Sequence, residues 1–251
     1  MNDRTALHGV RIHAPDLVSA SRVYAAITKT GCQMEAQQCH IPVGDATIRL
    51  TSGMPPVPIT GRRTELVGIW GLDLGVADPQ ARLTACEKAG FVTQQSANGF
   101  STDLNGVRVF FGPLSAKTET TAAQVKLDHV ALLVKDLARA TRQWELLTGL
   151  TAHYMAIHPV SQGTLSAARF ALGPRMIELL SPIVGTESAL RDRLHKVGEG
   201  PMALALPAHD LEATLAALRT ANIGTAYREP HWVVRPSVAI VPIQLTPRVG
   251  H

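Results

Sequence analysis

Leu127-Asp128-His129-Val130-Ala131-Leu132, with Lys135-Asp136-Leu137 close behind, is one of four copies of the same pattern in this chain. In each copy an apolar run of strand character precedes an Asp that is followed by Leu or Pro. The other three runs begin at Leu7, Ile69 and Pro201, and their aspartates are Asp16, Asp78 and Asp210. A repeat of roughly sixty residues indicates one supersecondary unit used several times, and it has to be identified before other features are interpreted.

Each copy continues with the same order of expected elements. The Asp is typical of a helix N-cap, and the amphipathic stretch 137–147 ends near a glycine, a residue typical of helix C-termini. Short apolar runs follow, such as 167–172 and 176–180, and the Gly173-Pro174 between them is typical of a turn. The unit is therefore predicted to be βαβββ. Four strands are too few for an independent core, so two units are expected to share one curved, eight-stranded sheet.

These features resemble the vicinal oxygen chelate superfamily, which includes glyoxalase I, bleomycin-resistance proteins, extradiol dioxygenases and methylmalonyl-CoA epimerase. The local similarity is strongest in the second half and is to the epimerase. The segments that carry it are 127–131, 135–137, 176–182, 198–200 and 242–245. The resemblance implies an α+β fold of four βαβββ modules paired into two domains, residues 1–114 and 125–251. The second domain is expected to carry the active site, and the polar, Thr-rich segment between the two domains is the expected linker.

Composition restricts the class of protein. The chain has 251 residues, 45% of them hydrophobic, which suits two compact domains of about 100 to 200 residues each. A net charge of +4 without a basic tract, together with 4% aromatic residues, disfavours a nucleic-acid partner. No apolar stretch reaches the roughly 18 residues of a membrane span, and the N-terminus lacks the apolar core of a secretory signal. We therefore expect a cytoplasmic protein with a small-molecule substrate and no membrane partner; a homodimer is compatible with the sequence.

The cysteines Cys32, Cys39 and Cys86 form no C-x-x-C motif. Cys32 and Cys39 lie close together in the first unit, but disulfides are rare in proteins that are not secreted. The sequence therefore predicts buried or half-buried thiols instead of a disulfide.

In the superfamily, metal ligands come from the first and last strands of two paired units. The resemblance assigns these positions to His129 and Glu178 in the third unit, and to Ala203 and Gln244 in the fourth. Imidazole and carboxylate are strong ligands for a divalent cation, an amide oxygen is weaker, and Ala203 contributes nothing. One divalent metal ion held by His129, Glu178 and Gln244 is therefore one alternative. The other is a metal-free site in which Glu178 acts as a base.

The equivalent positions of the first half are Gly9, Arg49, Gly71 and Phe110. None of these side chains is a usable metal ligand, so no metal is expected there. Arg49 either turns the cavity of the first domain into an anion pocket or lies at its rim without a binding role.

Other polar residues of the second half are candidates for contacting substrate or for replacing the missing imidazole. A shift of one residue in strand register would turn any of them to the other face, so each is also compatible with a structural or rim position. The candidates for substrate binding are Gln244, Arg169, His153, His231 and Tyr154, and His158 is a further candidate imidazole.

Three functions remain open. The first is an isomerase, epimerase or lyase in which Glu178 or His129 moves a proton next to the carbonyl of a small organic acid, thioester or polyketide-like substrate. The second is an extradiol-type metal dioxygenase, which needs a third strong ligand in place of Ala203. The third is a non-catalytic, resistance-type protein that binds a small molecule. We favour the first, because polar groups persist in the second half where the first half has Gly9 and Arg49.

Overall fold

The computed structural model describes most of the chain. The described residues are 5–53, 59–60, 68–114, 125–160, 163–183, 189–228, 231–234 and 240–247. For residues 155–160 and 163, only the backbone is described. The predicted linker, 115–124, and the side chain of His158 lie outside this description.

Both halves contain the same order of strands and helices. The first half consists of β1 (Thr5–His13), α1 (Leu17–Thr28), β2 (Gln33–Glu35), β3 (Gln38–Val43), β4 (Ala46–Thr51), β5 (Gly68–Val76), α2 (Pro79–Lys88), β6 (Thr93–Ser96), β7 (Gly99–Leu104) and β8 (Val107–Pro113). The second consists of β9 (His129–Leu133), α3 (Leu137–Thr148), β10 (His153–Val160), β11 (Gly163–Leu172), β12 (Arg175–Pro182), α4 (Ala189–Val197), β13 (Gly200–Ala208), α5 (Leu211–Thr220), β14 (Thr225–Arg228), β15 (His231–Val234) and β16 (Ile243–Pro247). Within the described residues, no helix has both the length and the apolar character needed to cross a membrane.

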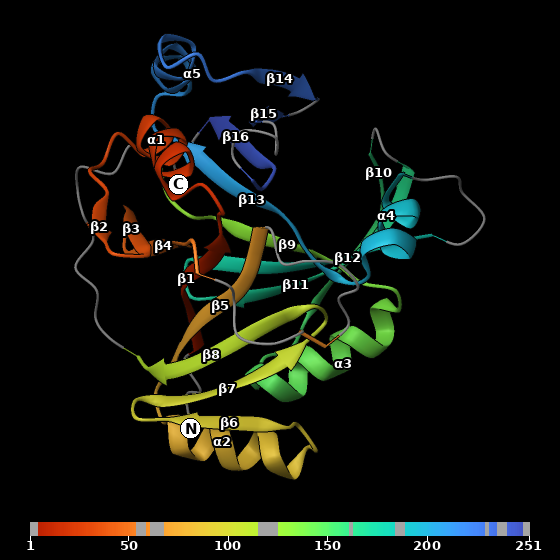
Figure 1. The fold of residues 1–251 in the computed structure, drawn as a ribbon. Helices are drawn as coiled ribbons and strands as arrows, with labels where there is room; N and C mark the ends of the chain where they lie inside the picture. The colour runs from red at the N-terminus through yellow and green to blue at the C-terminus, as the bar shows by residue number, and fades with distance from the viewer. Residues whose placement is uncertain are drawn as a thin grey trace.

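The strands form two sheets of eight, one from each half of the chain (Figure 1). Their orders are β2-β3-β4-β1-β5-β8-β7-β6 and β10-β11-β12-β9-β13-β16-β15-β14. In each sheet the central strands, β1 with β5 or β9 with β13, are antiparallel. Each central strand also pairs in parallel with the last strand of its own unit. The predicted α+β fold and the pairing of βαβββ units are therefore confirmed.

The repeated aspartates cap the helices, as predicted. Asp16, Asp78, Asp136 and Asp210 each accept a hydrogen bond from the backbone N–H three residues later, at 2.8 to 3.0 Å. These bonds satisfy donors that have no partner within the helix. An Asp N-cap therefore begins each of α1, α2, α3 and α5.

Replacing Asp136 with Ala is expected to lower the free energy of unfolding by about 1 kcal/mol, because the first turn of α3 loses its cap. Urea denaturation followed by circular dichroism measures the change. Asp136→Ser is the matched control, since a serine oxygen preserves the cap, and it should cost only a few tenths of a kcal/mol. Equal stability of the Ala variant and the wild type would show that this cap contributes nothing.

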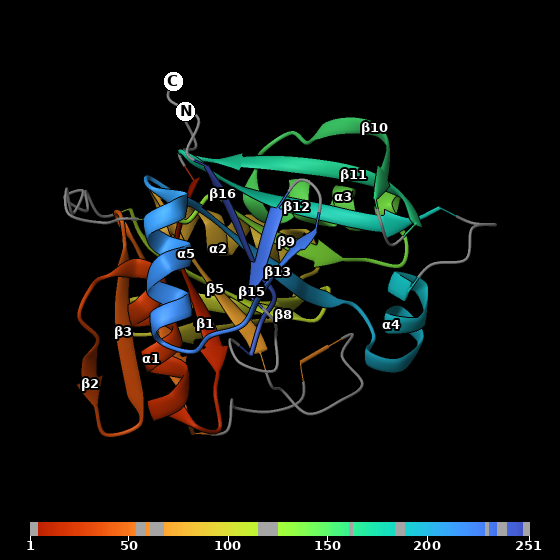
Figure 2. The ribbon, with the colours of Figure 1, turned by 90° about the horizontal axis from the view of Figure 1, so that it is seen from above.

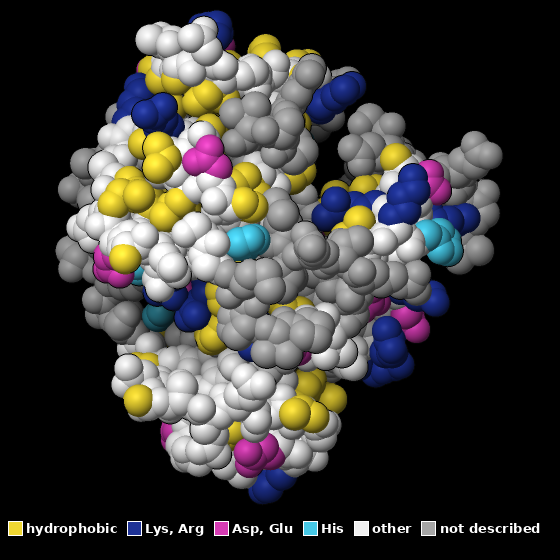
Figure 3. All heavy atoms as spheres, viewed as in Figure 1, with side chains coloured by type: hydrophobic (Ala, Val, Ile, Leu, Met, Phe, Trp, Pro, Cys, Tyr) yellow, Lys and Arg dark blue, Asp and Glu magenta, His cyan; other side chains and the backbone are white. Residues whose placement is uncertain are grey.

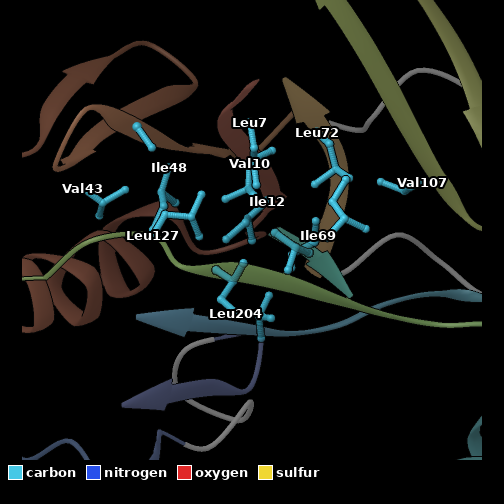
Figure 4. Packing of buried hydrophobic residues seen from close by; sticks show 14 of the residues in the cluster. Leu7, Val10, Ile12, Val43, Ile48, Ile69, Leu72, Val107, Leu127 and Leu204 are labelled. Atoms are coloured by element: carbon cyan, nitrogen blue, oxygen red, sulfur yellow. The ribbon is translucent and has the colours of Figure 1, made fainter. Parts of the chain in front are cut away.

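The core lies between the sheets and joins the two halves. Leu7, Ile12 and Leu72 of the first sheet pack close to Leu127 and Leu204 of the second half (Figure 4). On either side of these central strands the helices pair across the halves, α1 with α5 and α2 with α3 (Figures 1 and 2). Each sheet therefore buries one face in this shared core and turns its other face outward.

Helix α4 was not predicted from the sequence. Its Leu190 and Leu194, one turn apart, pack on the outward face of the second sheet against Leu133, Leu165 and neighbouring apolar side chains. The helix thus covers one end of that face with apolar contacts. In the space-filling view, a hollow separates the part that contains α4 and β10 from the part that contains β15 and β16 (Figure 3). We call the outward face of the second sheet between α4 and β15 the trough.

The prediction of free thiols was wrong for two of the cysteines. Cys32 and Cys39 form a disulfide, with their Cα atoms 6.0 Å apart. The reason is the hairpin of β2 and β3, in which Gln33 pairs with His40 and brings the flanking cysteines to a separation that a disulfide can span. Cys86 is a free, buried thiol as expected, and burial raises its pKa to about 11.

Candidate functional site

The candidate site lies on the outward face of the second sheet, at positions fixed by strand register. Glu178 on β12 pairs with the residue two positions beyond His129 on β9. Gln244 on β16 pairs with the residue two positions beyond Ala203 on β13. The third and fourth units thus hold equivalent positions, as the alignment of the repeats predicts. Because directly paired residues project to the same side of a sheet, both strand pairs aim these side chains into the trough.

His129 and Glu178 form the centre of the site. Nδ1 of His129 lies 2.7 Å from Oδ2 of Asp128, and its Nε2 lies 3.9 Å from Oε2 of Glu178. The other carboxylate oxygen, Oε1, accepts a hydrogen bond from Nε of Arg169 at 2.7 Å. The side chains of His129 and Glu178 are only 18% and 12% exposed. The pair is therefore held by charged neighbours and largely shielded from water.

These contacts determine which atoms are available for chemistry. A carboxylate can only accept a hydrogen bond, so Nδ1 of His129 carries the hydrogen that Asp128 accepts. Nε2 then presents its lone pair toward Oε2 of Glu178, which is also an acceptor. Two electron-pair donors thus face each other across 3.9 Å with their other polar atoms already engaged. A proton, a cation or a hydrogen-bond donor of a substrate fits between them.

A second imidazole, His231, lies beside this pair. It is two residues before Val233, which pairs with Gln244, so register places it on the same face. Burial lowers its pKa below the usual 6.5; His129 lowers it further, and Glu178 partly opposes the shift. Its Nδ1 is buried and has no hydrogen-bond partner among the described residues. His231 is therefore a neutral imidazole at neutral pH.

His231 is expected to titrate below pH 6.5, measured from its ring signals in NMR spectra across pH. Replacing His129 with Gln should raise this pKa, because protonated His129 disfavours a second positive charge on His231, and Glu178→Gln should lower it further. Because the folded state holds the neutral form, the contribution of His231 to stability is complete above about pH 6.5 and is lost as the pH falls toward the folded pKa. A wild-type pKa at or above 6.5 would contradict this placement.

The other predicted substrate-binding residues divide between the two faces. Arg169 is bonded to Glu178 and lies at the centre of the site. His153 on β10 pairs with Arg169 and is exposed at the edge of the trough. Tyr154 pairs with the buried Ala168, which faces the core, and its side chain is 63% exposed. The structure therefore brings Arg169 to the pair and leaves Tyr154 on the opposite face.

The side chains around His129 and Glu178 offer few donors for a divalent metal. His129 and Glu178 converge, but Ala203 supplies no donor, and Arg169 places a positive charge on the same carboxylate. Within the described ranges, no three His, Cys, Asp or Glu side chains come together as a group that could hold a metal ion. Structural and catalytic metal sites use three or four protein ligands. The residues present therefore fit such a site poorly.

The first sheet shows why its own site is different. By strand register, Gly9 and Arg49 lie at the positions that His129 and Glu178 occupy in the second sheet, as predicted. Gly71 and Phe110 lie at the positions of Ala203 and Gln244. A Cβ atom on Gly9 would lie 2.4 Å from the backbone oxygen of Thr47. The backbone therefore excludes a side chain, and hence an imidazole, at this position.

Asp128 is the functional residue that the sequence did not reveal. It lies next to His129, and strict alternation along a strand would turn neighbouring side chains to opposite faces. However, β9 begins at His129, so Asp128 precedes the strand and its carboxylate reaches the imidazole. The adjacent acidic residue in the motif was the available signal.

A scan against protein-family models supports the assignment of the second half. Residues 127–237 match the model of a glyoxalase-like domain. This range includes His129, Arg169, Glu178 and His231, but ends before Gln244. Comparison with curated protein sequences gives no match.

Two solved structures share the fold over nearly the whole chain, and a third matches about half of it. A variant of 4-hydroxymandelate synthase from Streptomyces coelicolor is 15% identical, with a TM-score of 0.67, over 98% of this chain and 94% of that chain. The 2,2',3-trihydroxybiphenyl 1,2-dioxygenase of Sphingomonas wittichii strain RW1 is 14% identical, with a TM-score of 0.65, over 96% and 89%. Methylmalonyl-CoA epimerase from Mycobacterium tuberculosis is 26% identical over 51% of this chain and 91% of that chain, with a TM-score of 0.43. The chain shares the fold of the first two of these structures, and residues 127–237 match a glyoxalase-like domain, which agrees with the resemblance to the vicinal oxygen chelate superfamily.

Proposed function

We propose that this protein is an isomerase or lyase that moves a proton next to the carbonyl group of a small organic acid, thioester or polyketide-like substrate. The observation that carries the proposal is the convergence of Nε2 of His129 and Oε2 of Glu178 across 3.9 Å in the trough. A positioned acid–base pair of this kind typically accelerates proton transfer by about 10²–10⁴-fold. The shielding of both side chains supports the same reading, because proton transfer is more effective in a site that holds few waters.

His129 is the proton acceptor in this proposal. Asp128 holds the imidazole by its Nδ1–H, which fixes the lone pair on Nε2 and stabilises the imidazolium that forms after proton uptake. When Nε2 takes the proton, the C–H bond of the substrate breaks and its electron pair moves toward the carbonyl oxygen as an enolate. Return of the proton to the same or a neighbouring atom completes an isomerisation.

Glu178 and Arg169 complete the acid–base pair. The carboxylate lies beside Nε2, where it stabilises the imidazolium and accepts the proton in turn. Arg169 holds this carboxylate in place and supplies positive charge beside the developing enolate. Gln244, on the same face of the sheet, offers an amide to the substrate oxygen.

Solvent exchange tests the proposal without knowledge of the exact substrate. A panel of 2-oxo acids, acyl thioesters and β-dicarbonyl compounds is incubated with the protein in D₂O, and loss of the C–H signal next to the carbonyl is followed by NMR. Exchange of at least one class above the protein-free rate is the expected result. If a compound binds in the trough but shows no exchange, the protein is a non-catalytic small-molecule binder.

A divalent metal at the same pair is the second candidate. If an ion were bound here, Nε2 of His129 and Oε2 of Glu178 would be the donors that hold it, although the rest of the donor set fits a metal poorly. Metal analysis of the purified protein and of its His129→Gln and Glu178→Gln variants separates the candidates. Metal that is present in the wild type and lost in both variants supports a metalloenzyme, and oxygen consumption with a catechol would then support an extradiol-type dioxygenase. A metal-free, active wild type supports acid–base catalysis.

Three further expectations complete the proposal. We infer that residues 1–114 and 125–251 are two domains, each built around one of the two sheets and packed on the other through the shared core. A cytoplasmic location and a homodimer are predictions as well. Size-exclusion chromatography with light scattering would determine the assembly.

A further inference from the structure

We propose that the outward face of the first sheet is a second ligand-binding site, specific for a small organic carboxylate. The site is a cavity of about 280 Å³ whose lining includes Arg11, Arg49, Asp73 and Phe110. It occupies the position in the first sheet that the trough occupies in the second. The inference concerns a different sheet and is independent of the proposed proton transfer.

The charges of the cavity are unbalanced. Arg11 donates from Nε to Oδ1 of Asp73 at 2.8 Å, and Nη1 of Arg49 lies 3.7 Å from Oδ2 of the same carboxylate. Among the residues that the structure describes, two guanidinium groups therefore share this one carboxylate, which leaves one positive charge without a matching anion. Glu35, the other acidic group that acts on Arg49, is 67% exposed and lies 4.0 Å from His40. A monoanion restores the balance.

Arg49 is the guanidinium that Asp73 neutralises less closely, because Asp73 lies 3.7 Å from Arg49 but 2.8 Å from Arg11. Its side chain is 29% exposed, and its Nε is buried with no hydrogen-bond partner among the described residues. Burial lowers the pKa of the guanidinium even though Asp73 opposes that shift. Part of the Arg49 side chain is nevertheless open to the cavity, and a carboxylate is the acceptor that a guanidinium binds best.

The remaining wall of the cavity favours an organic anion over an inorganic one. The guanidinium of Arg11 lies over the ring of Phe110, 3.4 Å from its centroid, and Phe110 packs edge-on against Trp70. Gly71 makes this stack possible, because a Cβ atom there would lie only 3.0 to 3.2 Å from Phe110 and Arg11. Arg11 is thereby fixed in place, and the half-buried Phe110 offers apolar surface for the body of the ligand.

The two sheets thus use equivalent positions for opposite charges. Arg49 stands where the second sheet has Glu178, and the strand register is the same at both sites. A carboxylate at that position accepts protons, whereas a guanidinium stays protonated and binds anions. The first sheet is therefore suited to holding a carboxylate and not to abstracting a proton.

Binding of 4-fluorobenzoate to the full chain, followed by ¹⁹F NMR titration, tests the proposal. We expect saturable binding of 4-fluorobenzoate and none of 4-fluorobenzamide, its neutral analogue. Arg49→Gln should weaken binding by about tenfold or more, because it removes a charge-assisted hydrogen bond. Asp73→Asn should strengthen binding several-fold, because it removes the competing carboxylate.

Two control variants locate the probe. Arg22→Gln changes an exposed arginine on α1 and should leave the affinity unchanged. Arg169→Gln, in the trough of the second sheet, should also leave it unchanged. Equal binding of the benzamide, undiminished binding by a folded Arg49→Gln variant, or loss of binding in Arg169→Gln would each overturn the proposal. Circular dichroism confirms that every variant is folded.

Discussion

Replacing Glu178 with Gln is expected to slow the exchange of the proton next to the substrate carbonyl by about 10²–10⁴-fold. Gln has nearly the same shape as Glu, and its amide oxygen can still accept the hydrogen bond from Arg169, so the fold of the trough is retained. The variant lacks the negative charge beside Nε2 of His129 and the second proton acceptor. The loss should therefore appear in the exchange rate and not in the free energy of unfolding.

His129→Gln should cause a loss of similar size, because the two side chains act on the same proton. In the double variant the exchange rate should fall no further than in the more damaged single variant, since groups that act as a unit are strongly non-additive. Glu212→Gln on α5 is the matched control: it neutralises an exposed carboxylate of the same half and should leave exchange unchanged. Multiplicative losses in the double variant would show that the residues act separately.

Trp144→Ala is expected to cause the largest loss of stability, about 3–5 kcal/mol. Trp144 on α3 is fully buried and packs near Phe170. Its indole N–H donates to Oδ1 of Asn105 at 3.0 Å, and the amide of Asn105 donates to Glu199 at 2.9 Å. The substitution therefore creates a cavity in the second half and leaves a buried acceptor of the first half without its donor.

Urea denaturation followed by circular dichroism measures this loss. Trp144→Phe keeps most of the apolar volume but removes the indole N–H, so its cost should be smaller than that of Trp144→Ala. Leu146→Ala, at a position that is 56% exposed on the same helix, should change stability by less than about 0.5 kcal/mol. A cost below about 1 kcal/mol for Trp144→Ala would contradict the role of this side chain in joining the halves.

The features that the sequence predicted are those that depend on local or periodic patterns. Asp136 and its three counterparts predict the start of a helix, because the cap is a hydrogen bond between residues only three positions apart. The equivalence of Glu178 with Arg49, and of Gln244 with Phe110, follows from the repeat, because each unit has the same strand lengths and register. The superfamily resemblance assigned the candidate site to these positions, and internal comparison of the units showed which residues replace them in the first half.

The features that the sequence did not predict depend on contacts across strands or on where a strand begins. The Arg169–Glu178 pair requires the register of β11 with β12, and the face of Tyr154 requires the register of β10 with β11. The disulfide between Cys32 and Cys39 follows from the tight hairpin of β2 and β3 and not from a spacing motif. Helix α4 is a short insertion between two strands of the repeated pattern, so the repeat itself gave no indication of it.

The exchange rate of metal-stripped wild-type protein in D₂O tests the central claim most directly. Protein treated with a chelator is mixed with a carbonyl compound that binds in the trough, and the signal of the C–H next to the carbonyl is followed by NMR beside an equal sample of Glu178→Gln. The His129–Glu178 account predicts rapid loss of that signal with the stripped wild type and a rate about 10²–10⁴-fold lower with the variant. Equal rates in the two samples, or exchange in the wild type only after a divalent metal is restored, would contradict it.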